Sequence, residues 1–479
     1  MHSVPTIGPR VYSGEEKKLE MKLCKILILV LSLSLTTVGQ ATTTIHATGL
    51  NAPNKIIKCP QDSLLVAEAG TTAPNTGRIS VVDRTTGARH TLIAGLPSAL
   101  NFLGGNPNGD PSGPSGLFLR GTLLYVTIGS GNSVMPGGGP GLETPNPTPA
   151  SPIFDSILEI NLPGGYPSLG SSFTLTFPQQ TLLDAGNTVT LSNLEGQEIE
   201  IRVVKNFPDW RPAPTPQVPG NVKASNLYGI EMWKKTIYVA DAGHNEIKGV
   251  SLRTGEVSVL VTFPPRPNPI FPIGGPFIEA VPDNLHRFGN RLLVPLLTGF
   301  PFIVGGSEIR VVNIRGGSSE VLIDGLSSAI DIVKASDDKE ELVEETVSRP
   351  IQGRSLGKLE LVESERINVF GGKGEVSPSP AERVSSGGVS VSSGGKVVAD
   401  GGPLSLDPGE GNAYYTLEFS TDMRNGTPGR LRFYESPDAT PLELVTNLTT
   451  PTSMTRDGDN GNIFITNIAP GTVTKVTFP

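Results

Sequence analysis

The chain has 479 residues and a net charge of −8, with 18% charged residues, 37% hydrophobic residues, 57 glycines and 43 prolines. So many glycines and prolines interrupt helices and separate short strands, which favours a turn-rich β protein. The negative charge and the lack of a basic stripe exclude a nucleic-acid partner, because phosphate binding needs clustered Lys and Arg.

Residues 1–41 have the pattern of an N-terminal extension followed by an export signal. From Met21, which we take as the true start, two lysines precede an apolar run (Ile26–Leu35), and small or polar residues follow up to Ala41. This run is too short to span a bilayer, and no later run is long enough. We therefore expect residues 42–479 to lack a transmembrane segment and to be secreted or periplasmic. An uncleaved anchor is the alternative.

The rest of the chain repeats one short pattern six times. Each unit has four short strand-like runs, here called strands A to D, separated by turn residues. In the clearest unit these runs are Gly229–Trp233, Thr236–Ala240, Glu246–Ser251 and Val257–Val261. Four antiparallel strands repeated radially form a β-propeller blade. The sequence therefore predicts an all-β fold, a six-bladed β-propeller over residues 42–479.

The two ends of the chain are complementary in this pattern. The sixth unit stops after its third strand, and a spare strand-like run, Thr43–Gly49, precedes the first unit. We expect the N-terminal strand to complete the last blade and close the ring, which removes an exposed edge. An insertion at 336–411 lies within blade five, and the sequence leaves open whether it is folded.

The long connections gather on one face of the predicted ring. Strand B ends and strand A begins on the same face, which also carries the B–C loops and the D–A connections. We call it the loop-rich face, and we expect it to hold the segments 104–116, 130–152, 171–225, 263–283 and 296–307. Function in repeat rings usually lies where loops are elaborated, so we expect the site on this face.

Aligning the B strands places six residues in equivalent positions around one mouth of the channel. They are Glu68, Ile128, Asp241, Leu296, Glu418 and Asn467. Four of them are oxygen donors of the kind that calcium binds, which predicts a calcium site formed by Glu68, Asp241, Glu418 and Asn467. The alternative is that each is a turn residue that bonds nearby backbone groups.

Other residues near this mouth are candidates for binding or acid–base chemistry. Asn54, Asn226 and Asp283 lie close to strand A starts and are expected to line the mouth. His244 follows Asp241, so both His244 and Asp283 are candidate catalytic bases. A solvent-facing loop histidine is the alternative for His244. Apart from these candidates, the sequence contains no established catalytic or phosphate-binding motif.

Several short segments of the chain resemble those of a known family. "LLVAEAG", "SNLYGI", "YVADAGHNEI", "AVPDNL" and "LLTGFPFIVGG" are similar to signatures of the ScyD/ScyE family, exported NHL-like six-bladed propellers named from a pigment gene cluster. The resemblance covers nearly all of 43–479 except the blade-five insertion and part of 171–205. It implies an exported propeller and supplies no catalytic set. Leu296 stands where relatives commonly carry Glu.

Two function classes follow from these observations. The first is an extracytoplasmic binding or scaffold module, accessory to a biosynthetic or surface process, that takes a small molecule, glycan or protein on the loop-rich face. The second is a calcium-dependent, lactonase-like hydrolase, in which the metal polarises a carbonyl or activates water. A quinone-dependent sugar dehydrogenase is a third option, but the sequence offers no His and Arg set over the channel to support it. Calcium is the one cofactor that the sequence suggests, and we expect a monomer. The sequence leaves open whether the protein is an enzyme.

Overall fold

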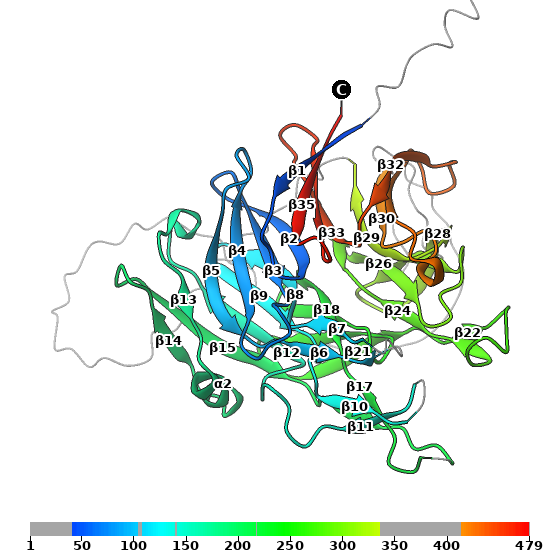
Figure 1. Cartoon of the computed structure of the whole chain (residues 1–479), viewed down its shortest axis with the longest axis horizontal. Helices are drawn as coiled ribbons and strands as arrows, with labels where there is room; N and C mark the ends of the chain where they lie inside the picture. The colour runs from blue at the N-terminus through cyan, green and yellow to red at the C-terminus, as the bar shows by residue number, and fades with distance from the viewer. Residues whose placement is uncertain (1–40, 104–107, 139–140, 217, 336–412, 479) are drawn as a thin grey trace, which may run out of the picture. The chain divides into compact units, whose positions relative to one another are not determined.

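The computed structural model describes residues 41–103, 108–138, 141–216, 218–335 and 413–478 (Figure 1). The predicted export signal and the blade-five insertion lie outside the described residues. The fold is a six-bladed β-propeller, as the repeat predicts. The described residues include three short helical segments: η2 (Tyr166–Ser168), α2 (Phe177–Asp184) and η3 (Met423–Asn425).

Each blade follows the predicted order of strands A to D from its inner to its outer edge. Blade one has β2 (Pro53–Cys59), β3 (Ser63–Glu68), β4 (Gly77–Asp83), β5 (Arg89–Leu96) and the added β13 (Phe173–Thr174). Blade two has β8 (Pro114–Arg120), β9 (Leu123–Ile128), β12 (Ser156–Asn161), β15 (Glu198–Asn206) and the added β14 (Val189–Ser192). Blade three has β18 (Leu227–Trp233), β19 (Thr236–Asp241), β20 (Glu246–Ser251) and β21 (Val257–Thr262).

The second half of the ring has the same plan, with strand A of blade four broken into two pieces. Blade four has β24 (Ala280–Pro282) and β25 (His286–Phe288), then β26 (Arg291–Thr298), β27 (Ser307–Asn313) and β28 (Ser319–Leu326). Blade five has β29 (Ala329–Lys334), β30 (Tyr414–Glu418), β31 (Gly429–Tyr434) and β32 (Leu442–Leu448). Blade six has β33 (Pro451–Arg456), β34 (Ile463–Asn467), β35 (Thr472–Thr477) and β1 (Thr42–Ala47).

Strand β1 completes blade six and confirms the predicted closure of the ring. It pairs antiparallel with β35, with Thr42 opposite Thr477 and Ile45 opposite Thr474. Figure 1 shows β1, at the blue end of the chain, beside the red β35. Four of the six β1 side chains are exposed, so this strand closes the blade mainly through its backbone.

Six hydrophobic clusters fill the six interfaces between neighbouring blades. Leu65 with Leu117 lies between blades one and two, Ile157 with Ile237 between two and three, and Ile247 with Val294 between three and four. The ring continues with Ile309 and Ile332, with Leu417 and Met454, and with Phe464 and Ile56. Alternating apolar residues on both faces of each sheet therefore give one core per interface.

Every innermost strand carries one extra residue just after its start. A register shift marks this β-bulge in five blades, and in blade four the break between β24 and β25 has the same effect. Groups at the bulges make one circuit of hydrogen bonds: Asn54 to Pro114, Ser115 to Leu227, Gly229 to Asp283, Asn284 to Ile330, Ser453 to Asp331, and Thr452 to Pro53. The bulges thus join each blade to the next and re-aim neighbouring side chains.

Four small hairpins build up the loop-rich face. They are β6 (Ala99–Asn101) with β7 (Asp110–Ser112), β10 (Val134–Pro136) with β11 (Glu143–Pro145), β16 (Trp210–Pro212) with β17 (Val222–Ala224), and β22 (Arg266–Pro267) with β23 (Phe277–Ile278). The segment 171–225 differs from its prediction. It contains strand D of blade two, β15, and residues 162–197 connect strands C and D, on the face opposite the loop-rich one.

Candidate functional site

The six residues aligned at the ends of the B strands occupy equivalent positions, as predicted. Five of them lie opposite the first residue of their own strand A: Glu68 opposite Pro53, Ile128 opposite Pro114, Asp241 opposite Leu227, Glu418 opposite Ala329, and Asn467 opposite Pro451. In blade four Leu296 lies opposite Pro282, the last residue of β24. The four polar side chains among the six, however, are bonded within their own blades or to the segments that lead into them.

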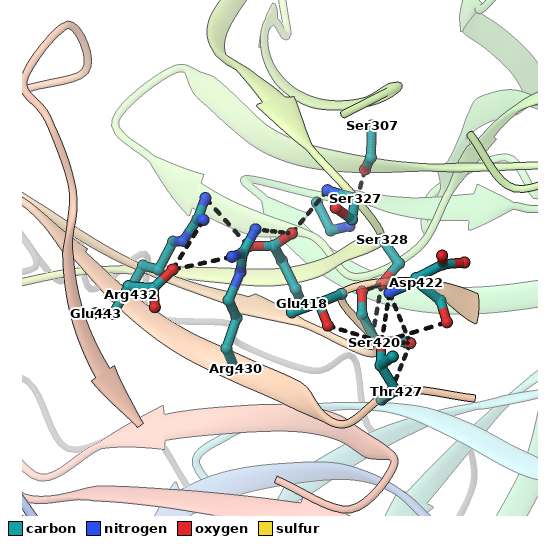
Figure 2. Close-up of polar contacts among 12 residues, drawn as sticks. Ser307, Ser327, Ser328, Glu418, Ser420, Asp422, Thr427, Arg430, Arg432 and Glu443 are labelled. Atoms are coloured by element: carbon teal, nitrogen blue, oxygen red, sulfur yellow. Dashed lines mark hydrogen bonds and ion pairs between the residues drawn. The ribbon is translucent and has the colours of Figure 1, made fainter. Parts of the chain in front are cut away.

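Glu418 of blade five is fully buried and is held by donors on strand C and on the segment before strand A. Its Oε1 accepts from Arg430 Nε at 2.6 Å, and its Oε2 accepts from the Ser327 backbone N–H at 2.7 Å. Figure 2 shows Glu418 among these partners, with Arg432 and Glu443 extending the network beyond Arg430. The carboxylate therefore joins the segment before strand A to strand C. We call this arrangement a blade-end bond.

Glu68 makes the same blade-end bond in blade one. Its Oε2 accepts from Arg78 Nε at 2.7 Å and from the Asn51 backbone N–H, and its Oε1 accepts from Ser80 Oγ. In both blades the arginine stands directly opposite the acid and follows a glycine, Gly77 in this one. A Cβ on Gly77 would lie 2.8 Å from Pro114 of the next blade, so this position has no room for a side chain.

Asp241 of blade three makes the blade-end bond with a lysine in place of arginine. Its Oδ2 accepts from Lys248 Nζ at 2.5 Å and from Ser225 Oγ at 2.7 Å, and its Oδ1 accepts from the Asn226 N–H at 3.0 Å. Burial alone would raise the pKa of Asp241, but His244 and Lys248 outweigh it and hold the pKa well below its usual range. This carboxylate is therefore charged and saturated with donors.

His244 is buried beside Asp241, and both of its ring nitrogens are engaged. Its Nε2–H donates to the Lys223 carbonyl oxygen at 3.1 Å, and its Nδ1 lies 2.9 Å from Asp241 Oδ2 and 3.1 Å from Lys248 Nζ. The residue is only 5% exposed. His244 thus braces a blade-end bond, and this geometry gives no support to its predicted role as a catalytic base.

The predicted calcium ligands are not brought together. Asn467 donates to Thr474 Oγ1 at 2.9 Å within blade six, and among the described residues no group of three His, Cys, Asp or Glu side chains could hold a metal ion. Asn54 and Asn226 also serve the ring, since Asn54 donates to Pro114 O and Asn226 Oδ1 accepts from Ser130 N–H. A calcium site therefore stays a prediction from the sequence.

A second polar group lies at the centre of the ring, on the A strands. Asp331 of β29 is fully buried and accepts from His286 Nε2 at 2.7 Å, Ser453 Oγ at 2.9 Å and Met454 N–H at 2.8 Å. Lys55 Nζ lies 3.7 Å from Asp331 Oδ2. These partners come from blades four, six and one. Blades one and five are not neighbours, so Lys55 and Asp331 meet across the central channel.

Electrostatic coupling extends this group to Asp283 and Glu231. Burial, followed by the charge of Asp331, raises the pKa of Asp283 to about 8, against the opposing effect of Lys55. Burial raises the pKa of Glu231, and His286 and Lys55 oppose it. Asp283 and Glu231 nevertheless keep partial solvent accessibility, and both belong to the innermost part of their blades, which surrounds the central channel of a propeller. We call Lys55, Glu231, Asp283, His286 and Asp331 the channel cluster.

The sequence interpretation found one of these five residues as a site candidate, Asp283, and missed the others. The signal was present: Lys55 and Asp331 are the single charged residues inside the short A-strand runs "NKII" and "AIDIV". A charge inside such a run is expensive to bury unless it is paired. Perturbed pKa values in an enclosed site are a physical indicator of function. The channel cluster is therefore the better candidate site.

Two loops of blade four expose large apolar side chains on the loop-rich face. Residues 263–283 carry Phe271, Ile273 and Phe277, and residues 296–307 carry Phe300 and Val304; all five are between 45% and 61% exposed. We call them the aromatic surface.

The two loops are joined to each other by polar contacts. Arg266 Nη2 donates to Gly306 O at 2.6 Å, and Gly299 N–H donates to Glu279 O at 3.0 Å. The β22–β23 hairpin in Figure 1 carries one of these loops, which leads directly into Asp283 of the channel cluster.

Comparisons with known proteins were made for families, curated proteins and solved structures. No protein-family model matches the chain, and no curated protein matches it. Solved structures similar to it include the aldose sugar dehydrogenase of Escherichia coli, with 9% identity over 92% of this chain and 100% of that one, at a TM-score of 0.44. An auxiliary nutrient binding protein of Bacteroides thetaiotaomicron has 8% identity over 92% and 77%, at a TM-score of 0.43.

A third similar structure is the virginiamycin B lyase of Staphylococcus aureus, with 9% identity over 92% of this chain and 99% of that one, at a TM-score of 0.37. TM-scores below 0.5 at such identities carry no argument about ligand, partner or reaction. The comparisons also do not confirm the narrower resemblance to the ScyD/ScyE family.

Proposed function

We propose that the protein is a binding module that docks an apolar protein partner on its aromatic surface. The observation that carries this proposal is the set of five exposed Phe, Ile and Val side chains on two joined loops. Exposed apolar groups of this kind mark interaction sites, and aromatic side chains are enriched in protein interfaces. None of the five has a hydrogen-bonding group, so they suit an apolar protein surface better than a glycan.

The proposed setting is extracytoplasmic, in an accessory role to a biosynthetic or surface process. The export pattern of residues 21–41 and the resemblance to the ScyD/ScyE family support it. Among the described residues, no helix is long and apolar enough to cross a membrane. No observation favours the calcium-dependent hydrolase in its place, because Glu68, Asp241 and Glu418 are each saturated by donors of their own blade.

The test compares partner capture by three forms of the purified chain. They are the wild type, the double variant Phe271→Ser/Phe277→Ser, and the control Leu194→Ser, which changes a 95% exposed leucine outside the aromatic surface. Each is incubated with envelope and extracellular fractions of the organism that makes it, and bound proteins are quantified by mass spectrometry. We expect a protein retained by the wild type and the control, and about 10-fold less retained by the double variant.

Two outcomes would contradict the proposal. One is equal retention of every bound protein by all three forms. The other is a wild-type dimer that the double variant converts to a monomer in analytical ultracentrifugation, since the aromatic surface would then be a contact between copies.

A further inference from the structure

The channel cluster contains polar atoms that its internal bonds leave without a partner. Lys55 is 3% exposed, and its ammonium has no hydrogen-bond partner among the described residues. Its nearest anion, Asp331 Oδ2, is 3.7 Å away, which is too far for a hydrogen bond. Asn284 directly follows Asp283 in the chain and is 1% exposed. Its Oδ1 also has no hydrogen-bond partner within the described parts of the chain.

The same Asn284 side chain is otherwise firmly held. Its Nδ2 donates to Ile330 O at 3.0 Å and to Thr452 O at 3.2 Å, which fixes the amide across blades four, five and six. The orientation of the unpartnered Oδ1 is therefore set by the ring. Leaving a buried donor or acceptor unsatisfied costs about 1–3 kcal/mol, and more for a charged group. One unpartnered donor and one unpartnered acceptor thus remain buried at the centre of the ring, where Asp283 and Glu231 are partly exposed.

The charges around Lys55 Nζ and Asn284 Oδ1 limit the kind of molecule that could form hydrogen bonds with both atoms. An anion would be repelled by Asp331, whose pKa is held at about 2 because Lys55 and His286 outweigh the effect of burial. A cation would be repelled by Lys55 itself. A hydroxyl group both donates and accepts, so it can accept from Lys55 and donate to Asn284.

We propose that the central channel binds a small neutral polyhydroxyl compound, a sugar or polyol, through Lys55, Asn284 and Asp283. Lys55 donates to a ligand hydroxyl, and Asn284 Oδ1 accepts from one. Asp283 is coupled electrostatically to Lys55 of β2, Tyr228 of β18 and Asp331 of β29. Below about pH 8 it is protonated and contributes a further donor. This site is separate from the aromatic surface, and neither proposal depends on the other.

The experiment is ligand-observed NMR on the purified full chain with glycerol, myo-inositol and D-glucose as probes, followed by calorimetric titration. We expect saturable binding of at least one probe, with Kd on the order of 1 mM. Lys55→Met should weaken it at least about 10-fold, since the charged donor is lost. Lys58→Met is the matched control, because Lys58 lies on the same strand with its side chain 37% exposed, and it should bind as the wild type does.

A pH series keeps the test decisive where Lys55→Met does not fold. In the wild type, ionised Asp283 above about pH 8 competes for Lys55, so binding should weaken there. In Asp283→Asn the group cannot ionise, and binding should not change across that range. The proposal is overturned if no probe binds saturably at millimolar concentration, which would mean that water alone serves these atoms. Binding that Lys55→Met leaves unchanged in a folded chain would overturn it equally.

Discussion

The blade-end bonds and the channel cluster are both made of buried charges, but they are satisfied to different degrees. Glu418 accepts from an arginine and a backbone N–H supplied by its own blade and the segment leading into it. Lys55 and Asp331 meet instead from blades that are not neighbours, and the Lys55 ammonium keeps no hydrogen bond within the described chain. The blade-end bonds therefore have their hydrogen-bonding groups filled, whereas the channel cluster retains an unfilled donor.

This difference separates structure from function more clearly than residue type does. A carboxylate whose acceptor sites are filled stabilises the fold and has little capacity left for a ligand or a metal. A charge that the fold buries without completing its bonds is a candidate for binding. The strand-end acids drew attention first because they repeat, and a structural bond that recurs in blades one, three and five produces this repetition.

The largest expected effect is on a blade-end bond. Glu418→Ala should lower the free energy of unfolding by about 3–5 kcal/mol, because it leaves Arg430 largely buried without its main anion. Urea denaturation followed by fluorescence measures the change. Glu435→Ala, at an exposed acid of the same blade, should change stability by less than about 0.5 kcal/mol.

Thermal unfolding of the wild type tests the calcium prediction. If the strand-end acids are saturated, the wild-type melting temperature should be the same in EDTA and in millimolar calcium, because only a ligand that binds the native state raises stability. A rise with calcium that Glu68→Gln or Asp241→Asn abolishes would instead restore the calcium site and the hydrolase hypothesis.

A smaller effect, with a marked pH dependence, is expected in the channel cluster. Folded Asp283 keeps its proton up to about pH 8, whereas the unfolded chain releases it near pH 4. Between these values the folded state binds more protons, so wild-type stability should fall as pH rises. A pKa raised from about 4 to about 8 corresponds to at most about 5 kcal/mol, and the partial exposure of Asp283 reduces it. Asp283→Asn removes this dependence and should therefore be more stable than the wild type at pH 8 by about 2–3 kcal/mol, relative to the difference at pH 4.

Denaturation curves of the wild type and Asp283→Asn at pH 4, 6 and 8 provide the measurement. A wild type whose stability relative to the variant stays constant over this range would show that Asp283 titrates normally and that the channel does not couple it to Asp331.

The smallest expected effect is at His244, which supports Asp241 without being its main cation. His244→Leu removes the bond from Nε2 to the Lys223 carbonyl and the contact of Nδ1 with Asp241 Oδ2, but it keeps the backbone N–H that donates to Asp241. The loss should be about 1 kcal/mol by thermal or urea unfolding. A loss as large as that of Glu418→Ala would mean that His244, and not Lys248, is the principal partner of Asp241.

Much of the fold was predictable because its signals are local. The four strands of blade three were predicted within one or two residues of their observed ends, and the equivalence of Glu68, Asp241 and Glu418 follows from the repeat. The closing strand Thr42–Ala47 was also found, because the sixth unit is one strand short. Periodicity and turn residues are sufficient for such features.

The site was harder to predict because its contacts are long-range. Repetition showed that Glu68 and Glu418 are equivalent, but not that Arg78 and Arg430 stand opposite them. The Gly-Arg pair that begins strand C in both of these blades was the missed signal. The meeting of Lys55 with Asp331 depends on ring closure and on a bulge in each strand. No local pattern contains that information.

The pairing of β1 with β35 also has a consequence for the order of folding. Thr42 pairs with Thr477, so blade six cannot be completed until nearly the whole chain has been made. Contacts of such large sequence separation form slowly, and five blades can assemble while Phe464 and its neighbours still lack part of their cover. Until that last pairing the molecule is an open arc, and its final shape depends on the meeting of the two ends.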